Sequence, residues 1–131
     1  MDHFTSFATE IFLLIFLAIV FLQSGVDKIM DWKGNLSWLT GHFSKTILKG
    51  AVPLLLGTIL LAEIATGALS VMGVYEFLCI GESSFAFYAA TVAAITLLLL
   101  LFGQRIAKDY EGAKTIVIYL IPTLFLVFLL Q

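Results

Sequence analysis

Four long apolar segments constrain the fold of this chain more than any other feature of its sequence. A transmembrane helix needs about 20 consecutive apolar residues. Runs of about that length cover residues 7–22 (continuing toward Met30), 51–74, 84–102 and 115–130. None alternates with the period of two typical of a membrane β-barrel. Because a bilayer cannot satisfy backbone polar groups, we expect one all-α domain, residues 1–131, built as a bundle of four transmembrane helices.

The composition excludes several other classes of protein. Hydrophobic residues make up 61% of the chain and charged residues only 12%, against about 25% charged in a soluble domain. The net charge of −2 gives no basic footprint for nucleic acid. Neither phosphate-binding glycine motifs nor clusters of cysteine and histidine that would hold zinc occur in the sequence. We therefore expect membrane lipid as the surroundings and no metal site.

The basic residues predict an orientation in the membrane. All seven fall in two connections between spans: Lys28, Lys33, Lys45, Lys49, Arg105, Lys108 and Lys114. Loops on the cytoplasmic side carry the excess of lysine and arginine. We therefore expect both termini outside and both basic connections inside.

The first connection contains a further helical pattern. Leu36, Leu39, Phe43 and Ile47 recur at helical spacing after Asn35, a residue type that often caps a helix N-terminus. The pattern predicts a short amphipathic helix at the membrane interface, beginning after Asn35.

Glu63 is the most informative single residue. It lies near the middle of the second span, where a charge costs about 2.5–3.5 kcal/mol on insertion scales. Such residues face the bundle interior and are functional candidates by default. Thr66, Gly67 and Ser70 follow at intervals that place them on the same helix face. Two interpretations stay open: Glu63 is a catalytic or ligand-binding acid, or it holds neighbouring helices together as a polar contact.

Other polar residues could share a pocket with Glu63. Thr91 lies at a similar depth in the third span, and Tyr119 and Thr123 lie somewhat shallower in the fourth. Lys28, at the inner end of the first span, is a candidate electrostatic partner. The predicted ligand-pocket residues are therefore Lys28, Thr66, Gly67, Thr91, Tyr119 and Thr123.

Two short motifs resemble those of the DoxX family, small four-helix membrane proteins of bacteria. Gly25 and Lys28 match a Gly-x-x-Lys at the end of the first helix. Glu63 and Gly67 match a glutamate followed, four positions on, by a small residue in the second helix. The resemblance implies a bacterial inner-membrane protein associated with redox systems such as a thiosulfate:quinone oxidoreductase, and a quinone as candidate ligand.

The third connection is more charged than the resemblance would imply. Arg105, Lys108, Asp109 and Tyr110 lie in it, and we take them as candidates for docking a protein partner at the inner face. Because the sequence contains no residues suited to hold a redox centre, electrons would have to come from such a partner.

Three functions follow from these features. We expect first a non-catalytic accessory subunit of a larger inner-membrane complex. The alternative is a quinone-interacting subunit of an oxidoreductase, in which Glu63 would hydrogen-bond or protonate a quinone oxygen. A proton or solute carrier is the weakest of the three, because transporters commonly show internal repeats and broken helices. Whether the chain is itself an enzyme stays open.

Overall fold

The computed structural model describes residues 2–131, and within them every regular element is a helix. The bounds of the six helices are α1 (Asp2–Ser6), α2 (Ala8–Met30), α3 (Trp32–His42), α4 (Val52–Ile80), α5 (Ser84–Ile106) and α6 (Tyr110–Leu130). Helices α2, α4, α5 and α6 are long and apolar enough to cross a membrane. The predicted all-α fold with four membrane-spanning helices is therefore confirmed.

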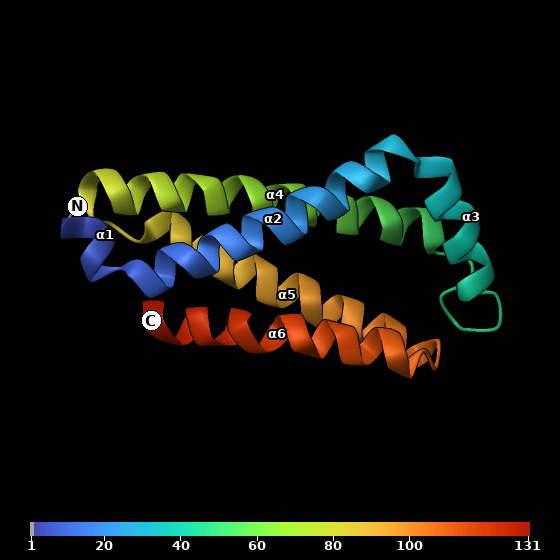
Figure 1. The fold of residues 1–131 in the computed structure, drawn as a ribbon. Coiled ribbons are helices and arrows are strands. Elements are labelled where there is room, and N and C mark those ends of the chain that lie inside the picture. Colours follow the sequence, from blue (N-terminus) through green and yellow to red (C-terminus); the bar gives the residue numbers. More distant parts are fainter. Residues whose placement is uncertain (1) are drawn as a thin grey trace.

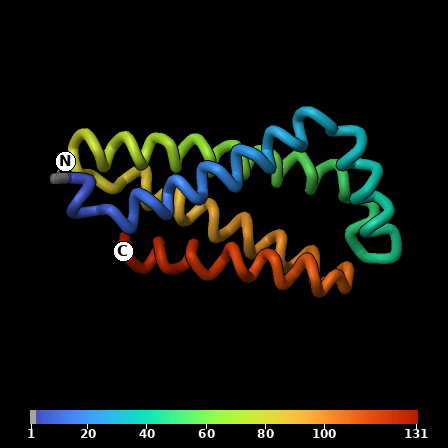
Figure 2. The backbone as a smooth tube through the Cα atoms, viewed as in Figure 1, coloured from blue at the N-terminus to red at the C-terminus, as the bar shows by residue number. Residues whose placement is uncertain are grey.

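The four long helices pack in the order of the chain (Figure 1). α2 packs along α4, α4 along α5, and α5 along α6, whereas α2 and α6 touch only slightly. α2 and α6 therefore form the two margins of an open bundle. The tube trace shows both termini at one end of the molecule and α3, with the α5–α6 turn, at the other (Figure 2).

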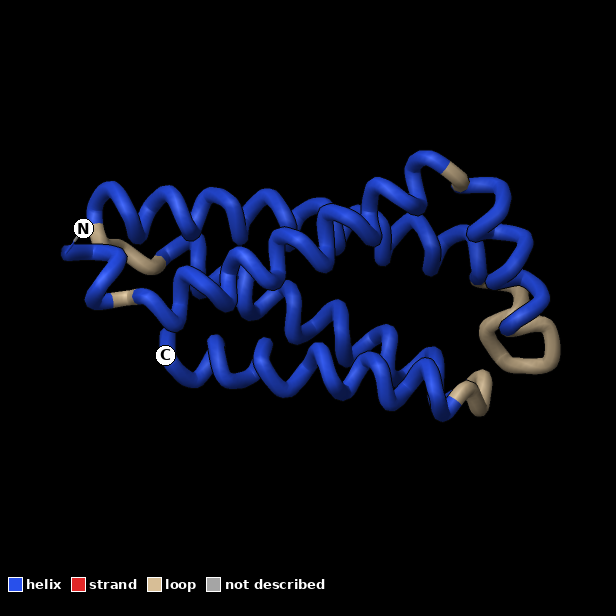
Figure 3. The backbone as a smooth tube through the Cα atoms, in the orientation of Figure 1, coloured by secondary structure: helices blue, strands red, loops and turns tan. Residues whose placement is uncertain are grey.

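The spans are longer than the hydropathy runs predicted, and the connections are correspondingly shorter (Figure 3). α4 continues to Ile80, α5 continues to Ile106, and α6 already begins at Tyr110. Only residues 81–83 and 107–109 separate these helices. The prediction that Arg105 and Tyr110 lie in the third connection was therefore wrong, because both belong to helices, whereas Lys108 and Asp109 do lie in the turn. Helical hydrogen bonding extends through polar residues that hydropathy excludes from a span.

The first connection contains a helix, as predicted, but its start was wrong. α3 begins at Trp32, where the side chain of Asp31 accepts a hydrogen bond from the Gly34 N–H at 3.1 Å. Asp31 thus satisfies one of the free N–H groups at the helix start. Asn35 lies inside α3 and donates to the Asp31 carbonyl at 2.8 Å. α3 ends at His42, so Ile47 lies beyond it among turns and is 86% exposed.

Small residues form much of the contact between α4 and α5. The inner face of α5 is built from buried alanines at positions 86, 89, 90, 93 and 94, and α4 packs along α5 with the buried Gly73 against Ala86. At Gly73, a β-carbon would lie 3.1 Å from the Ala86 backbone. Small residues let membrane helices approach this closely. The predicted inner face of the second span, Glu63 to Ser70, is confirmed as buried.

Glu76 caps α5 from a neighbouring helix. The apolar run of the second span ends at residue 74, which left this residue in the following connection, but it is buried near the end of α4. It accepts hydrogen bonds from the Ser84 hydroxyl at 2.8 Å and from the Phe85 N–H at 3.0 Å. A carboxylate at a helix N-terminus also interacts favourably with the helix dipole.

Removing this cap should destabilise the protein. We expect Glu76→Ala to lower the free energy of unfolding by about 1–2 kcal/mol, because two donors at the start of α5 lose a charged acceptor. Titration of the purified chain with sodium dodecyl sulfate, followed by circular dichroism, measures the change. Glu82→Ala, at an exposed carboxylate of the same connection, should have no effect; an equal loss there would contradict the cap.

Candidate functional site

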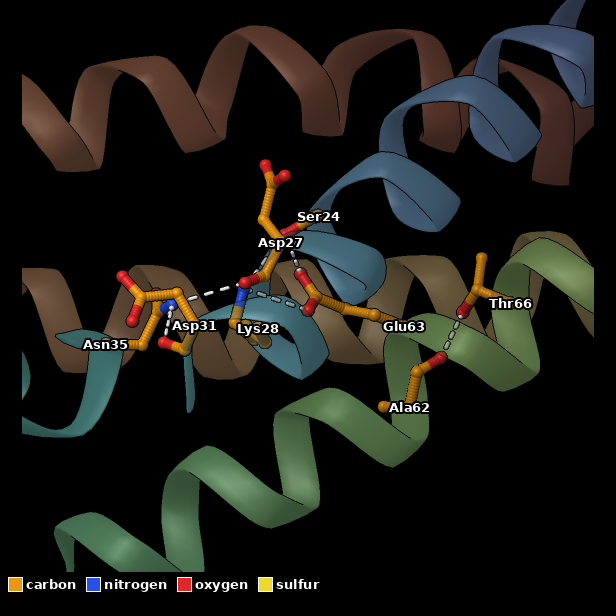
Figure 4. Close-up of polar contacts among 8 residues, drawn as sticks. All are labelled: Ser24, Asp27, Lys28, Asp31, Asn35, Ala62, Glu63 and Thr66. Carbon is orange, nitrogen blue, oxygen red and sulfur yellow. Dashed lines mark hydrogen bonds and ion pairs between the residues drawn. The ribbon is translucent and has the colours of Figure 1, made fainter. Parts of the chain in front are cut away.

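Glu63 forms an ion pair with Lys28 across the contact between α2 and α4 (Figure 4). The Lys28 ammonium nitrogen lies 3.0 Å from Glu63 Oε1, and the Ser24 hydroxyl donates to Glu63 Oε2 at 2.6 Å. Lys28 also donates to the Ser24 hydroxyl at 2.9 Å. The three side chains therefore form a closed polar triangle, which we call the Ser24–Lys28–Glu63 cluster.

The cluster is buried, but the two oxygens of Glu63 are not equally satisfied. The Glu63 side chain is 4% exposed and that of Lys28 is 17% exposed. Oε2 accepts the short hydrogen bond from Ser24. Oε1 faces the ammonium group within ion-pair distance, yet it receives no hydrogen bond of acceptable geometry from any described residue. A carboxylate oxygen can accept two hydrogen bonds, so Oε1 has capacity for one more donor beside the Lys28 ammonium.

Two glycines let α2 and α4 approach closely beside the cluster. A β-carbon at Gly25 of α2 would meet the Ile64 side chain of α4, and a β-carbon at Gly67 of α4 would meet the Leu22 side chain of α2. Each helix thus inserts a large side chain against a glycine of the other. This reciprocal packing brings the two helix backbones together at the level where Lys28 reaches Glu63.

A cavity of about 300 Å³ lies against the cluster. Ser24 and Glu63 contribute to its wall, together with Tyr119 of α6 and apolar side chains of α2, α5 and α6. Gln23 and Asp27, which are exposed, also line it, so the cavity communicates with the surroundings. It occupies the region where α2 and α6, the margins of the bundle, scarcely touch. Polar and apolar side chains share its wall in similar proportion, which suits a polar head group joined to an apolar chain.

Some of the predicted pocket residues lie at the site. Lys28 contacts Glu63 directly, and Tyr119 lines the cavity. Gly67 serves the packing of α2 against α4 rather than a ligand.

The threonines lie elsewhere. Thr66 points away from the cluster and donates to the Ala62 carbonyl of its own helix at 2.8 Å (Figure 4). Thr123 is buried and donates to the Tyr119 carbonyl. Thr91 is half-buried and lines neither this cavity nor the one described below. Hydroxyl groups that bond within their own helix are satisfied there and offer little to a ligand.

Ser24 is the member of the cluster that the pocket prediction missed. It lies four residues before Lys28, so both side chains project from the same face of α2. This spacing was the available signal. The spacing alone does not show that this face of α2 meets Glu63, because that depends on the rotation of α2 relative to α4.

Some of the residues predicted to dock a partner already contact other residues of this chain. Arg105 lies over the Tyr110 ring at 5.0 Å, and Asp109 caps α6 by accepting from the Gly112 N–H at 2.9 Å. Asp109 also lies 3.7 Å from His42 of α3. Lys108 is exposed and has a positive φ of 59° in the tight turn.

Residues 2–131 contain no group of three or more histidine, cysteine, aspartate or glutamate side chains placed to hold a metal ion. Comparison with known proteins finds no matching family model, no similar curated protein and no similar solved structure.

Proposed function

We propose that this chain is a membrane subunit that binds the polar head of a lipid-soluble, quinone-type molecule in the cavity beside the Ser24–Lys28–Glu63 cluster. The observation that carries the proposal is the buried carboxylate of Glu63, which lines the cavity and whose Oε1 has only the Lys28 ammonium as a partner among the described residues. In this proposal the chain works within a larger inner-membrane redox complex, in which a partner supplies or removes the electrons. The residues that resemble the DoxX family, Lys28 and Glu63 among them, support this choice.

The ion pair changes the role that Glu63 would have toward such a ligand. A quinone carbonyl only accepts hydrogen bonds, whereas the hydroxyl of the reduced, hydroquinone form donates one. As the carboxylate of an ion pair, Glu63 accepts, so it would bind the hydroxyl of the reduced form and could take its proton. Lys28 does not line this cavity, so it would act on the ligand only by holding Glu63 as a carboxylate. The site thus favours the hydroquinone over the quinone.

The accessory-subunit hypothesis has its own support in the same cluster. Ser24 and Lys28 come from α2 and Glu63 from α4, so the cluster also fastens these two helices together. On this second proposal the chain contributes structure to the complex, and its exposed Lys108 turn contacts a partner. The two proposals differ in whether a ligand binds beside Glu63.

Binding of reduced decylubiquinone to the purified chain in mild detergent separates the two proposals. We expect Glu63→Gln to weaken binding about tenfold, because the amide replaces a charged acceptor by a neutral one. Glu82→Gln, an exposed carboxylate away from the cavity, should leave the affinity unchanged. A Glu63→Gln variant that folds and binds as tightly as the wild type would refute the ligand site. An absence of binding by the folded wild type would favour the accessory role.

A further inference from the structure

A second cavity lies beneath α3, at the end of the molecule opposite the termini. Its volume is about 400 Å³. Its walls come from α3, from the turns between α3 and α4, from the start of α4 and from the last turns of α5. The lining is dominated by large apolar side chains, among them Trp38, Leu39, Phe43, Leu48, Leu56 and Leu99.

The polar side chains at this cavity are already engaged. Lys28 pairs with Glu63, Asn35 donates to the Asp31 carbonyl, and the Gln104 side-chain oxygen bonds to His42 at 2.9 Å. Thr58 also lines the cavity, and its hydroxyl donates to the Leu54 carbonyl of the same helix. The cavity interior therefore offers mainly apolar contact. The ligand group that suits this cavity is a hydrocarbon chain and not a polar head group.

The charges around this end of the molecule favour an anionic ligand. Outside the Lys28–Glu63 pair, the sequence places six basic residues here and only four acidic ones, Asp27, Asp31, Asp109 and Glu111. The connections at the opposite end contain no lysine or arginine. Lys45 and Lys49 are exposed and flank the cavity-lining Leu48. Basic residues near a membrane surface attract anionic lipids by about 1 kcal/mol each.

We propose that the cavity beneath α3 binds one acyl chain of an anionic phospholipid, whose phosphate group lies against Lys45 and Lys49. Such a lipid is available wherever the four spans lie in a bilayer, and α3 and the adjoining turns would lie at the depth of its headgroup. The cavity has the size of a specific ligand site. Among their lining residues this cavity and the one at Tyr119 share only Leu100, and the inference goes beyond the quinone-type ligand and does not depend on it.

Lipid retained by the purified 131-residue chain tests the inference. The protein is purified in mild detergent, incubated with dioleoylphosphatidylglycerol or dioleoylphosphatidylcholine, washed, and analysed for bound lipid by mass spectrometry. The two probes share their acyl chains and differ in headgroup charge. We expect about one phosphatidylglycerol per chain and at least about fivefold less phosphatidylcholine, from the attraction of two lysines.

Filling the cavity should remove the lipid. Gly103 lines the cavity, and a β-carbon there would lie 3.5 Å from Phe43, an ordinary contact. The β-carbon of Gly103→Leu therefore fits, and we expect this variant to lower phosphatidylglycerol retention at least about fivefold, since a larger side chain at a lining position takes up space of the acyl chain. Gly41→Leu is the matched control, because no atom lies within 4 Å of a β-carbon at Gly41. Leu48→Trp, on the turns, should reproduce the loss if Gly103→Leu does not fold.

The headgroup contact has its own variants. Lys45→Gln with Lys49→Gln should remove the preference for phosphatidylglycerol over phosphatidylcholine, whereas Lys114→Gln, an exposed lysine on α6, should preserve it. Retention that survives both cavity-filling variants would overturn the acyl site. Equal retention of the two lipids by the wild type would overturn the anionic headgroup. A quinone retained in place of phospholipid, and lost in Gly103→Leu, would overturn the assignment to phospholipid.

Discussion

Lys28→Met should lower the free energy of unfolding by about 3 kcal/mol, the largest loss that we expect from a single substitution in this chain. The variant leaves the Glu63 carboxylate buried in the bundle without its cation, and only Ser24 still donates to it. An uncompensated charge costs far more than the ion pair contributes. Titration with sodium dodecyl sulfate, followed by circular dichroism, measures the loss.

A double variant separates the charge from the packing. Lys28→Met combined with Glu63→Met removes both charges and keeps side chains of similar length, so we expect stability within about 1 kcal/mol of the wild type. Lys33→Met, at an exposed lysine of α3, controls for general loss of positive charge and should change nothing. A double variant as unstable as Lys28→Met would show that the two charges are not coupled. Because it should still fold, the double variant also tests ligand binding without an unfolding artefact.

Gly67→Ala should destabilise the protein by about 2 kcal/mol, because its methyl group would overlap the Leu22 side chain. α2 and α4 would have to separate where Lys28 meets Glu63. The loss should shrink to below about 0.5 kcal/mol in a Leu22→Ala background, since the truncated side chain leaves room for the methyl group. The same titration, applied to the wild type, both single variants and the double variant, measures the free energies of unfolding for this double-mutant cycle.

In the matched control for Gly67→Ala, we expect the substitution to raise the free energy of unfolding instead of lowering it. Gly41→Ala adds a methyl group to α3 in open space and should stabilise the helix by about 0.5–1 kcal/mol through propensity alone. An unchanged loss for Gly67→Ala in the Leu22→Ala background would mean that contact with Leu22 is not the cause. The two glycines together therefore test whether close packing, and not the loss of glycine itself, explains the effect.

The sequence predicted what depends on one helix at a time. Apolar length identified the four spans, and helical spacing identified the buried face with Glu63 and Gly67. What it missed depends on how helices are rotated against one another. Thr123 was a fair candidate by depth, yet it bonds within α6. Glu76 was assigned to a loop because hydropathy does not register a carboxylate that caps the next helix.

In the candidate site, too, features of a single helix were predictable and features that depend on the rotation of helices were not. Glu63 and its electrostatic partner Lys28 were predictable, since a charge in a span needs compensation and few cations lie within reach. Ser24 was visible only as part of a polar helix end. A pocket beside Glu63 and Tyr119 was predicted, but the walls of the two cavities were not, because they depend on where α2, α3 and α6 fail to fill space. The role of Arg105 and Asp109 as local contacts also required the short turn at residues 107–109.

Both charged members of the cluster belong to the first two spans, and this has a consequence for how the chain enters a bilayer. Lys28 and Glu63 can neutralise each other as soon as α2 and α4 form a hairpin, before α5 and α6 have been synthesised. The glycine contacts between these two helices need no later segment either. Insertion can therefore proceed with the charge already compensated, and the last two spans, which contain no acidic residue between positions 84 and 106 or between 112 and 130, can join a preformed pair.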